Sequence, residues 1–374
     1  MEFIDLQAQY RALKRDIDDG IAEVLNSSKY IIGPQVEKLE KELAEYVGRK
    51  YCITCSDGTA ALQLIYMVYG IGTGDAVFCP DMTFIASIEP ACLLGATPVF
   101  CDIDKISYNL DPISLEKQIQ AVIEEGRLTP KAIVAVDFVG NPADYKRISS
   151  IASKYNLLLI EDAAQGMGAS VDGKKCCSFG EVAATSFFPS KPLGCYGDGG
   201  AVFTDDIEIA NRLKSLRVHG KGVDKYHNIA VGTNSRLDSI QAAILLPKLH
   251  VLEKEILMRQ KVACRYEEGL SDKYITPTID KKNISSYAQY VIKYKKKGVR
   301  DSIIDLLKEN DIPSLLYYPV PLHMLPVFEN VECYSETYVN TIEYSSEHFG
   351  IPFSPYIREE DQERVIAILN SVEL

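Results

Sequence analysis

The amino-acid sequence predicts an α/β protein, with a large domain around a mostly parallel sheet and a smaller α+β domain at its C-terminal end. Three observations favour this class. Short runs that are apolar throughout alternate with helical periodicity in the first part of the chain, as in parallel sheets that are buried on both faces. One long helical stretch follows, and the segment beyond it mixes strand-like and helical patterns.

The elements of the large domain follow one another in a regular order. Residues 3–34 predict a helical arm before the first strand, and we expect this arm to pack on the outside of the large domain or on a partner. The runs that we interpret as buried strands are residues 76–79, 97–100, 132–136 and 157–160.

The small domain is predicted to begin within one continuous helix. Residues 238–270 contain no glycine before Gly269, which indicates a long helix with a kink at Pro247. We therefore place a large domain at residues 1–245, including the helical arm, and a small domain at residues 246–374. Within the small domain, residues 290–292 predict a strand, and residues 302–309 and 360–369 predict helices.

Composition excludes several classes of protein. Apolar residues make up 47% of the chain and charged residues 25%, which is typical of a soluble globular protein. No run is long enough to cross a membrane, and the N-terminal segment has no signal-peptide pattern, so we expect an unprocessed cytoplasmic protein. The net charge of −12 argues against a general nucleic-acid binder, because neutralising phosphates needs clustered basic residues.

The cysteines and histidines do not predict a metal site. Cys52 and Cys55 have the spacing of a metal or redox motif, but no second pair completes it, and cysteine often serves as a small buried apolar residue. The 10 cysteines are scattered, and the five histidines are too dispersed to form a cluster. We expect reduced thiols and no bound metal.

Three segments at the ends of predicted strands could carry chemistry. Gly58 and Thr59 follow a short strand and begin a helix, where free amides bind phosphate, although the same pattern also serves as a simple helix cap. Asp162 follows the strand at residues 157–160, at the sheet edge where α/β proteins bind ligands. Lys191 lies between serine-rich and glycine-rich turns, and burial would make its amine nucleophilic.

These three segments together meet the needs of one cofactor. Pyridoxal phosphate requires a phosphate cradle, a partner for its ring nitrogen and a lysine that bonds its carbonyl carbon. Gly58 with Thr59, Asp162 and Lys191 are the matching residues. Each segment is ambiguous by itself, so the interpretation depends on their combination.

An ordered set of motifs over nearly the whole chain resembles the DegT/DnrJ/EryC1/StrS family of sugar aminotransferases. The motifs are residues 3–6 (FIDL), 58–59 (GT), 80–84 (PDMTF), 161–165 (EDAAQ), Ser186 with Lys191, 197–200 (GDGG), 217–220 (RVHG), 232–238 (GTNSRLD) and 317–323 (YYPVPLH). The resemblance implies the aspartate-aminotransferase-like fold, known as fold type I of the pyridoxal-phosphate enzymes. It also implies a transaminase that uses L-glutamate as the amino donor.

The resemblance assigns roles residue by residue. It implies that Lys191 and Asp162 are catalytic, the first as the cofactor-binding lysine and the second as the partner of the ring nitrogen. It further implies that Gln165 bonds the ring hydroxyl and that Phe84 stacks on the ring. The phosphate is then held by Gly58, Thr59 and Ser186, and by Asn234 of the neighbouring subunit in a homodimer with shared active sites. The implied substrate contacts are Arg236, His219, Tyr317, Tyr318 and His323.

Within the family, the chain is most similar to enzymes that aminate carbon 3 of a UDP-linked 3-keto N-acetylhexosamine uronic acid for surface polysaccharides such as lipopolysaccharide O-antigen. The similarity lies in residues 186–200, 234–249 and 287–290. Arg236 is the candidate for the sugar carboxylate, since arginine binds a carboxylate bidentately. Tyr317 replaces an expected histidine, and residues 137–140 (DFVG) also depart from the subgroup, so a 4-keto-6-deoxy sugar stays open as an alternative.

Other classes of protein fit the sequence less well. A related enzyme that removes a hydroxyl would have histidine at the position of Lys191, and a noncatalytic regulatory relative would not need the full set of cofactor residues. A nicotinamide oxidoreductase is suggested only by residues 70–74, which follow a helix and indicate a helix-ending turn. The sequence does not decide the nucleotide, the aminated carbon or any assembly beyond a dimer.

Overall fold

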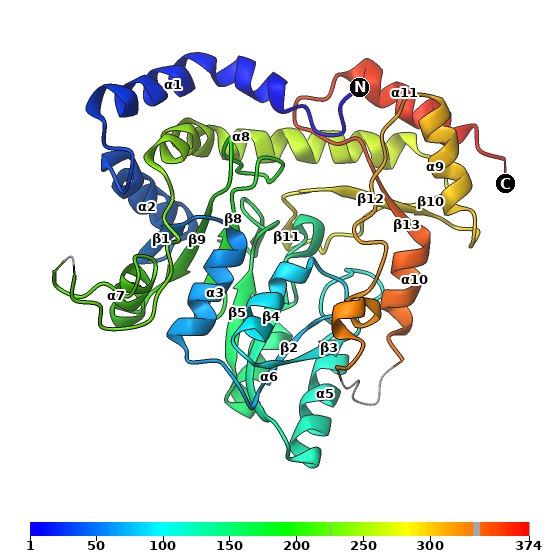
Figure 1. Ribbon diagram of the computed structural model, residues 1–374. Helices are drawn as coiled ribbons and strands as arrows, with labels where there is room; N and C mark the ends of the chain where they lie inside the picture. Colours follow the sequence, from blue (N-terminus) through cyan, green and yellow to red (C-terminus); the bar gives the residue numbers. More distant parts are fainter. Residues whose placement is uncertain (225, 332–336, 374) are drawn as a thin grey trace.

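The computed structural model describes residues 1–224, 226–331 and 337–373, and a seven-stranded sheet forms its centre (Figure 1). The sheet is mostly parallel; only β9 runs antiparallel to its neighbours. This arrangement confirms the predicted α/β class. The strands in spatial order are β1 (Tyr51–Cys55), β9 (Gly200–Thr204), β8 (Val182–Ser186), β5 (Leu158–Asp162), β4 (Thr129–Val136), β2 (Asp75–Pro80) and β3 (Thr97–Cys101).

Helices cover both faces of this sheet, because alternate strand residues point to opposite sides. On β4, Val134 and Val136 pack in the core with α3 and α7, whereas Ile133 and Ala135 pack with α5 and α6. The first face carries α3 (Gly58–Val68), α4 (Glu89–Leu93) and α7 (Ile207–Leu216), and the second carries α5 (Pro112–Glu125), α6 (Tyr145–Tyr155) and α2 (Pro34–Val47). All four predicted buried strands are therefore present, with bounds that differ by a few residues.

Two long helices lie side by side along one edge of the molecule (Figure 1). They are α1 (Leu6–Ser27) and α8 (Ser239–Gly269). Leu13 and Ile17 of α1 pack against Ile244 of α8, and Gln9 donates a hydrogen bond to Glu255 at 2.9 Å. The predicted long helix is confirmed as α8, which contains Pro247, and the N-terminal arm is helical over a shorter range than residues 3–34.

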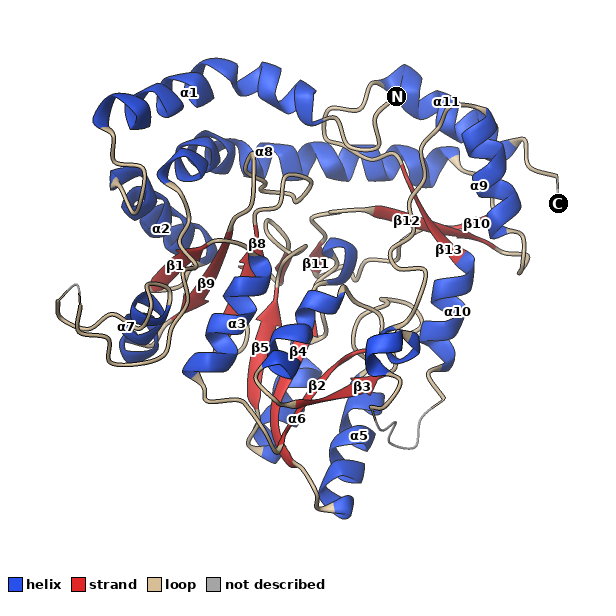
Figure 2. Ribbon diagram, viewed as in Figure 1, coloured by secondary structure: helices blue, strands red, loops and turns tan. Residues whose placement is uncertain are grey.

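The C-terminal part forms a second, smaller α+β layer (Figure 2). Its antiparallel sheet has the order β10 (Tyr274–Ile275), β12 (Tyr290–Tyr294) and β13 (His348–Ile351), and its helices are α9 (Arg300–Glu309), α10 (Val339–Glu347) and α11 (Glu359–Asn370). A third small sheet joins β11 (Asn283–Ile284), β6 (Ser170–Val171) and β7 (Lys174–Lys175). The division at residues 245 and 246 falls inside α8 and stays a prediction.

Short 3-10 turns complete the architecture. They are η1 (Ile85–Ser87), η2 (Phe138–Gly140), η3 (Leu322–Met324) and η4 (Pro326–Phe328). Among the helices in the described residues, none combines the length and the apolar character that crossing a membrane requires.

Candidate active site

A cavity of about 380 Å³ opens at the carboxyl ends of β4, β5 and β8 and the N-terminus of α3. α/β proteins bind ligands at this edge of the sheet. The predicted site residues that line the cavity are Gly58, Thr59, Phe84, Asp162, Gln165, Ser186, Lys191, Tyr317 and Tyr318. The fold thus brings together segments that lie far apart in the sequence.

The N-terminus of α3 forms one wall of the cavity. Asp57 caps the helix, because its Oδ1 accepts a hydrogen bond from the Ala60 amide at 2.7 Å. The first amides of a helix have no acceptor within the helix, so those of Gly58 and Thr59 can bind an anion. Ser186 lies directly against this turn: a Cβ on Gly58 would come within 2.8 Å of the Ser186 Cβ. Glycine is therefore required for this close approach.

Asp162 is buried at the end of β5, on the sheet face that α3 covers. The Ser87 hydroxyl donates a hydrogen bond to its Oδ2 at 2.7 Å, and the Ala164 amide donates to its Oδ1 at 3.1 Å. Burial raises the pKa of this carboxyl above its usual range, while these two hydrogen bonds and the charge of Lys191 oppose the rise. A buried carboxylate in this position is stabilised by any cation that enters the cavity.

Lys191 lies half-buried in the turn after β8 and faces the same cavity. Burial lowers the pKa of its amine to about 8, and the negative charge of Asp162 limits the fall. A larger fraction of the amine is therefore neutral near pH 7 than for an exposed lysine, and the neutral form is the nucleophile. The predicted activation of this lysine by burial fits these surroundings.

Two glutamines, Gln165 and Gln289, form a further part of the wall. The Gln165 Oε1 accepts a hydrogen bond from the Val139 amide at 2.7 Å, which fixes the orientation of its side chain. Phe84 lies exposed at the cavity, and its ring centroid is 5.8 Å from that of Tyr318. The sequence did not identify Ser87 or Gln289 as site residues: Ser87 belongs to none of the matched motifs, and the similarity at residues 287–290 assigned no role to Gln289.

Four predicted residues do not line the cavity of their own chain. The Nδ1 atom of His323 lies 2.6 Å from Oδ2 of the buried Asp81, and the His323 ring stacks on Tyr338. His219, Asn234 and Arg236 belong to the segment between α7 and α8, where His219 and Asn234 are exposed and Arg236 is half-buried. The roles assigned to these four residues stay predictions.

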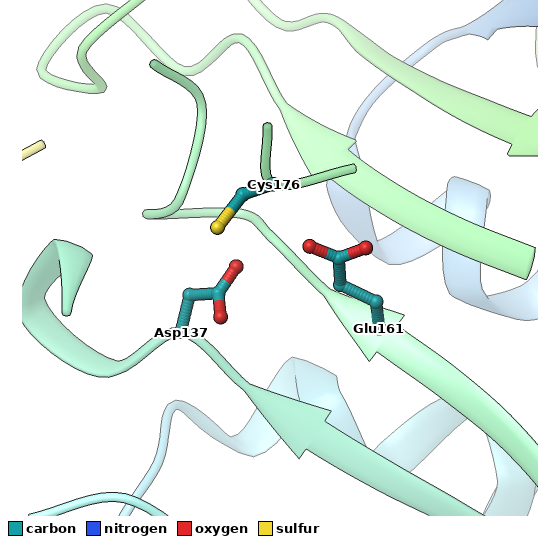
Figure 3. A group of neighbouring side chains, drawn as sticks. All are labelled: Asp137, Glu161 and Cys176. Atoms are coloured by element: carbon teal, nitrogen blue, oxygen red, sulfur yellow. The ribbon is translucent and has the colours of Figure 1, made fainter. Parts of the chain in front are cut away.

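Asp137, Glu161 and Cys176 form a buried cluster (Figure 3). Glu161 precedes Asp162 on β5, and because neighbouring strand residues point to opposite faces, this cluster lies on the other face of the sheet from Asp162. Glu161 already accepts backbone hydrogen bonds at both oxygens, from Cys177 and Phe179 at 2.6 Å each. The Oδ1 atom of Asp137 accepts from Tyr145 and Ala143.

Burial raises the pKa of both carboxyls in this cluster; the charge of Asp137 raises the pKa of Glu161 further, whereas hydrogen bonds oppose the rise at Asp137. The Oδ2 atom of Asp137 is buried and has no hydrogen-bond partner among the described residues. Because the other three carboxylate oxygens are occupied by donors, we interpret Asp137 and Glu161 as a pair that shares one proton.

Replacing Asp137 with asparagine is expected to make protein stability less dependent on pH. The raised pKa means that the folded pair keeps a proton that the unfolded chain releases above about pH 4. Stability should therefore fall as the pH rises through the pKa of the folded pair, by up to about 1.4 kcal/mol per pH unit for one proton. Asparagine keeps the side-chain shape and removes one titrating group. Unfolding in urea between pH 5 and 8 measures how steeply the unfolding free energy changes with pH in the wild type and in Asp137→Asn.

The matched control for this experiment is Asp19→Asn on the exposed surface of α1. It should leave the pH dependence of the unfolding free energy as in the wild type. Equal slopes for Asp137→Asn and the wild type would contradict a shared proton in the buried pair.

The geometry of the cavity fits pyridoxal phosphate. The N-terminus of α3 with Ser186 can hold a phosphate, Asp162 can pair with a protonated ring nitrogen, and Lys191 offers a reactive amine. The profile of the DegT/DnrJ/EryC1/StrS aminotransferase family matches residues 11–370. The chain belongs to this family. The match spans both the central sheet and the C-terminal layer.

Individual members of the aminotransferase family are similar over most of their length. The UDP-2-acetamido-2-deoxy-3-oxo-D-glucuronate aminotransferase of Pseudomonas aeruginosa is 50% identical, over 87% of this chain and 88% of that protein. A crystal structure of a family aminotransferase from Brucella abortus is 45% identical, with a TM-score of 0.96, and covers 99% of this chain and 98% of that one. A crystal structure of NtdA from Bacillus subtilis, with the cofactor PMP bound, is 28% identical, with a TM-score of 0.88, and covers 99% and 84%.

These findings confirm several predictions from the sequence. The chain has the fold of the pyridoxal-phosphate aminotransferases, and it is a transaminase of the sugar aminotransferase family that uses this cofactor. The alternative of a nicotinamide oxidoreductase is wrong, because the family is one of aminotransferases. The glycine-rich segment at residues 70–74 follows α3 as a turn before β2, as predicted.

Proposed function

We propose that this aminotransferase transfers the amino group of L-glutamate to a nucleotide-linked keto sugar, a UDP-linked 3-keto N-acetylhexosamine uronic acid. The product would enter a surface polysaccharide such as lipopolysaccharide O-antigen. The observation that carries the proposal is the single cavity that joins Lys191, Asp162 and the N-terminus of α3. The similarity to the Pseudomonas aeruginosa enzyme supports this choice of sugar.

Each residue of the cavity has a proposed task. Pyridoxal phosphate supplies, when bound, a carbonyl carbon that bonds amines and a ring that accepts electrons. Lys191 would hold it covalently, Asp162 would pair with the ring nitrogen, and Gln165 would bond the ring hydroxyl. Phe84 would cover the ring face, and the phosphate would be held by Gly58, Thr59 and Ser186.

Lys191 is also the proposed base and acid. Its neutral Nζ atom would take the proton from the amino-bearing carbon of L-glutamate and later deliver a proton to the sugar carbon that receives the amine. The lowered pKa of about 8 supports this task, because both protonation states are then accessible near neutral pH. Tyr317 and Tyr318 line the same cavity and would position the sugar beside this amine.

We propose a homodimer in which Asn234 and Arg236 serve the cavity of the partner. Both residues lie outside the cavity of their own chain, next to a loop with strongly exposed apolar side chains. In this loop, Val223 is 102% exposed and Val231 is 89% exposed, and such patches mark contact surfaces. Asn234 would complete the phosphate cradle and Arg236 would bind the sugar carboxylate. Light scattering at two protein concentrations tests the dimer.

The proposed compartment is the cytoplasm, and the adjacent Cys176 and Cys177 support it, because both are buried thiols outside any disulfide. His219 and His323 are proposed as more remote substrate contacts.

A 4-keto-6-deoxy nucleotide sugar is the second candidate substrate, since Tyr317 lies in the cavity wall where the uronic-acid subgroup is expected to have histidine. A panel of nucleotide sugars separates the two.

The experiment that tests the proposed function follows the absorbance of the purified protein. The wild type should show a band near the visible edge that borohydride fixes onto the Lys191 peptide. L-glutamate added to an untreated sample should shift that band and release 2-oxoglutarate. A protein that binds no pyridoxal phosphate when supplied with it would instead be a noncatalytic relative, and the proposed function would be lost.

A further inference from the structure

Gln289 is a buried polar residue in the cavity wall with an unused hydrogen-bond acceptor. It lies immediately before β12, and only 4% of its surface is exposed. Its Oε1 atom is buried and has no hydrogen-bond partner among residues 1–224, 226–331 and 337–373. Buried polar groups without a partner are uncommon, because each costs the free energy of its lost hydration. Such an atom in a cavity wall is suited to a ligand.

The backbone holds Gln289 next to Gln165. The backbone N–H of Val139 donates a hydrogen bond to the Gln165 Oε1 at 2.7 Å. The backbone carbonyl of Val139 accepts one from the backbone N–H of Gln289 at 3.5 Å. Val139 therefore ties both glutamines to one turn after β4. The Gln165 oxygen is occupied by this contact, whereas the Gln289 oxygen has no partner among the described residues, and Gln289 lines the cavity.

An acceptor such as the Gln289 Oε1 fits the keto sugar better than it fits L-glutamate. An amide oxygen takes a hydrogen bond from an N–H or O–H group. Apart from the amine that reacts, L-glutamate offers only carboxylate oxygens, which are acceptors and would repel this atom. A sugar offers donors on the carbons beside its carbonyl, and a cavity of about 380 Å³ admits the reacting part of the sugar while the nucleotide lies outside.

We propose that the Gln289 Oε1 accepts a hydrogen bond from the donor on the sugar carbon next to the reacting carbonyl. This inference rests on the proposed function, in which that donor is the N–H of the 2-acetamido group. Gln289 is then a specificity residue of the sugar half-reaction, and the contact distinguishes sugars with a donor at this carbon from those without one.

The test measures nucleotide-sugar binding to the cofactor-loaded protein by calorimetry. One probe is UDP-2-acetamido-2-deoxy-glucuronic acid, which carries the donor, and the other is UDP-2-deoxy-2-fluoro-glucuronic acid, which lacks one at that carbon. Gln289→Met keeps the side-chain length and removes the amide. It should raise the Kd of the first probe roughly tenfold and leave that of the second nearly unchanged. Gln289→Asn, which withdraws the amide by one methylene, should do the same.

The control variant is Gln120→Met, which removes an exposed amide on α5 that bonds the Tyr155 hydroxyl at 3.0 Å. It should bind both probes as the wild type does. Gln289→Met with wild-type affinity for the first probe, or with equal losses for both probes, would overturn the inference. The spectral response of the wild type to L-glutamate does not depend on the sugar. If that response is present, a negative result overturns only the role of Gln289; if it is absent, the proposed function itself fails.

Discussion

Replacing Lys191 with alanine is expected to lower turnover on the order of 10⁴-fold or more, as for other residues that act directly on the reacting atoms. Lys191 carries the only side-chain amine among the described residues that line the cavity. Lys248 is buried and also has a pKa lowered to about 8 by burial, but it cannot replace Lys191, because its Nζ atom donates to the Gly194 carbonyl at 2.6 Å. Steady-state transamination of L-glutamate measures the loss.

A small amine from solution provides the control for this variant. Alanine leaves space where the lysine side chain was, and ethylamine should restore part of the activity of Lys191→Ala in proportion to its concentration. The Lys191→Ala variant should also keep the wild-type melting temperature within a few degrees, because Lys191 is only half-buried and faces the cavity and not the packed core. Turnover by Lys191→Ala at the wild-type rate would refute the role of this residue.

The central sheet could be predicted because its strands are apolar on both faces. Residues 76–79, 97–100 and 132–136 lie inside β2, β3 and β4. The strand at residues 157–160 was misplaced at its end: β5 extends through Glu161 and Asp162, whose carboxyls interrupt the apolar run that defines a buried strand. The reversed direction of β9 depends on its pairing with β1 and β8, which no local pattern encodes.

The site residues that lie at or next to the end of a strand could be predicted from the sequence. Lys191 and Gly58 follow strands of the central sheet, and Asp162 ends one, so their segments were identifiable in order along the chain. Ser87 was not, because tertiary packing brings it to Asp162 across 75 positions of sequence. Gln289 was not identified as a site residue either, since its importance arises from burial without a partner, which is a property of the folded chain.

The segment between α7 and α8 shows a different limit on predicting site residues from the sequence. His219 and Asn234 were assigned through the family resemblance, and the folded chain presents both on its exposed surface. A single chain therefore does not bring them into its own cavity. In the homodimer that we propose, Asn234 would serve the cavity of a second copy, which neither the sequence pattern nor one subunit contains.

Replacing Asp162 with asparagine is expected to slow the glutamate half-reaction roughly 10²- to 10³-fold, the usual size of a lost electrostatic contact in an active site. The one oxygen of asparagine can still accept the hydrogen bond that the Ala164 amide donates to Oδ1, and its NH2 group can donate to the Ser87 hydroxyl, which is also an acceptor. It cannot stabilise a protonated ring nitrogen, because it carries no charge. Rapid mixing with L-glutamate, followed by absorbance, measures the rate of this half-reaction.

The same change should also lower the pKa of Lys191 below about 8, because the Asp162 charge is what raises it against burial. The pH at which the Lys191 amine reaches half of its maximal rate with an amine reagent, in the cofactor-free protein, should therefore move to a lower value.

Ser87→Ala separates the charge of Asp162 from its hydrogen bonding. It removes a hydrogen-bond donor that lowers the Asp162 pKa but leaves the carboxylate in place. This variant should slow the half-reaction far less than Asp162→Asn. Equal losses in the two variants would mean that Asp162 acts through its hydrogen-bonded position and not through its charge.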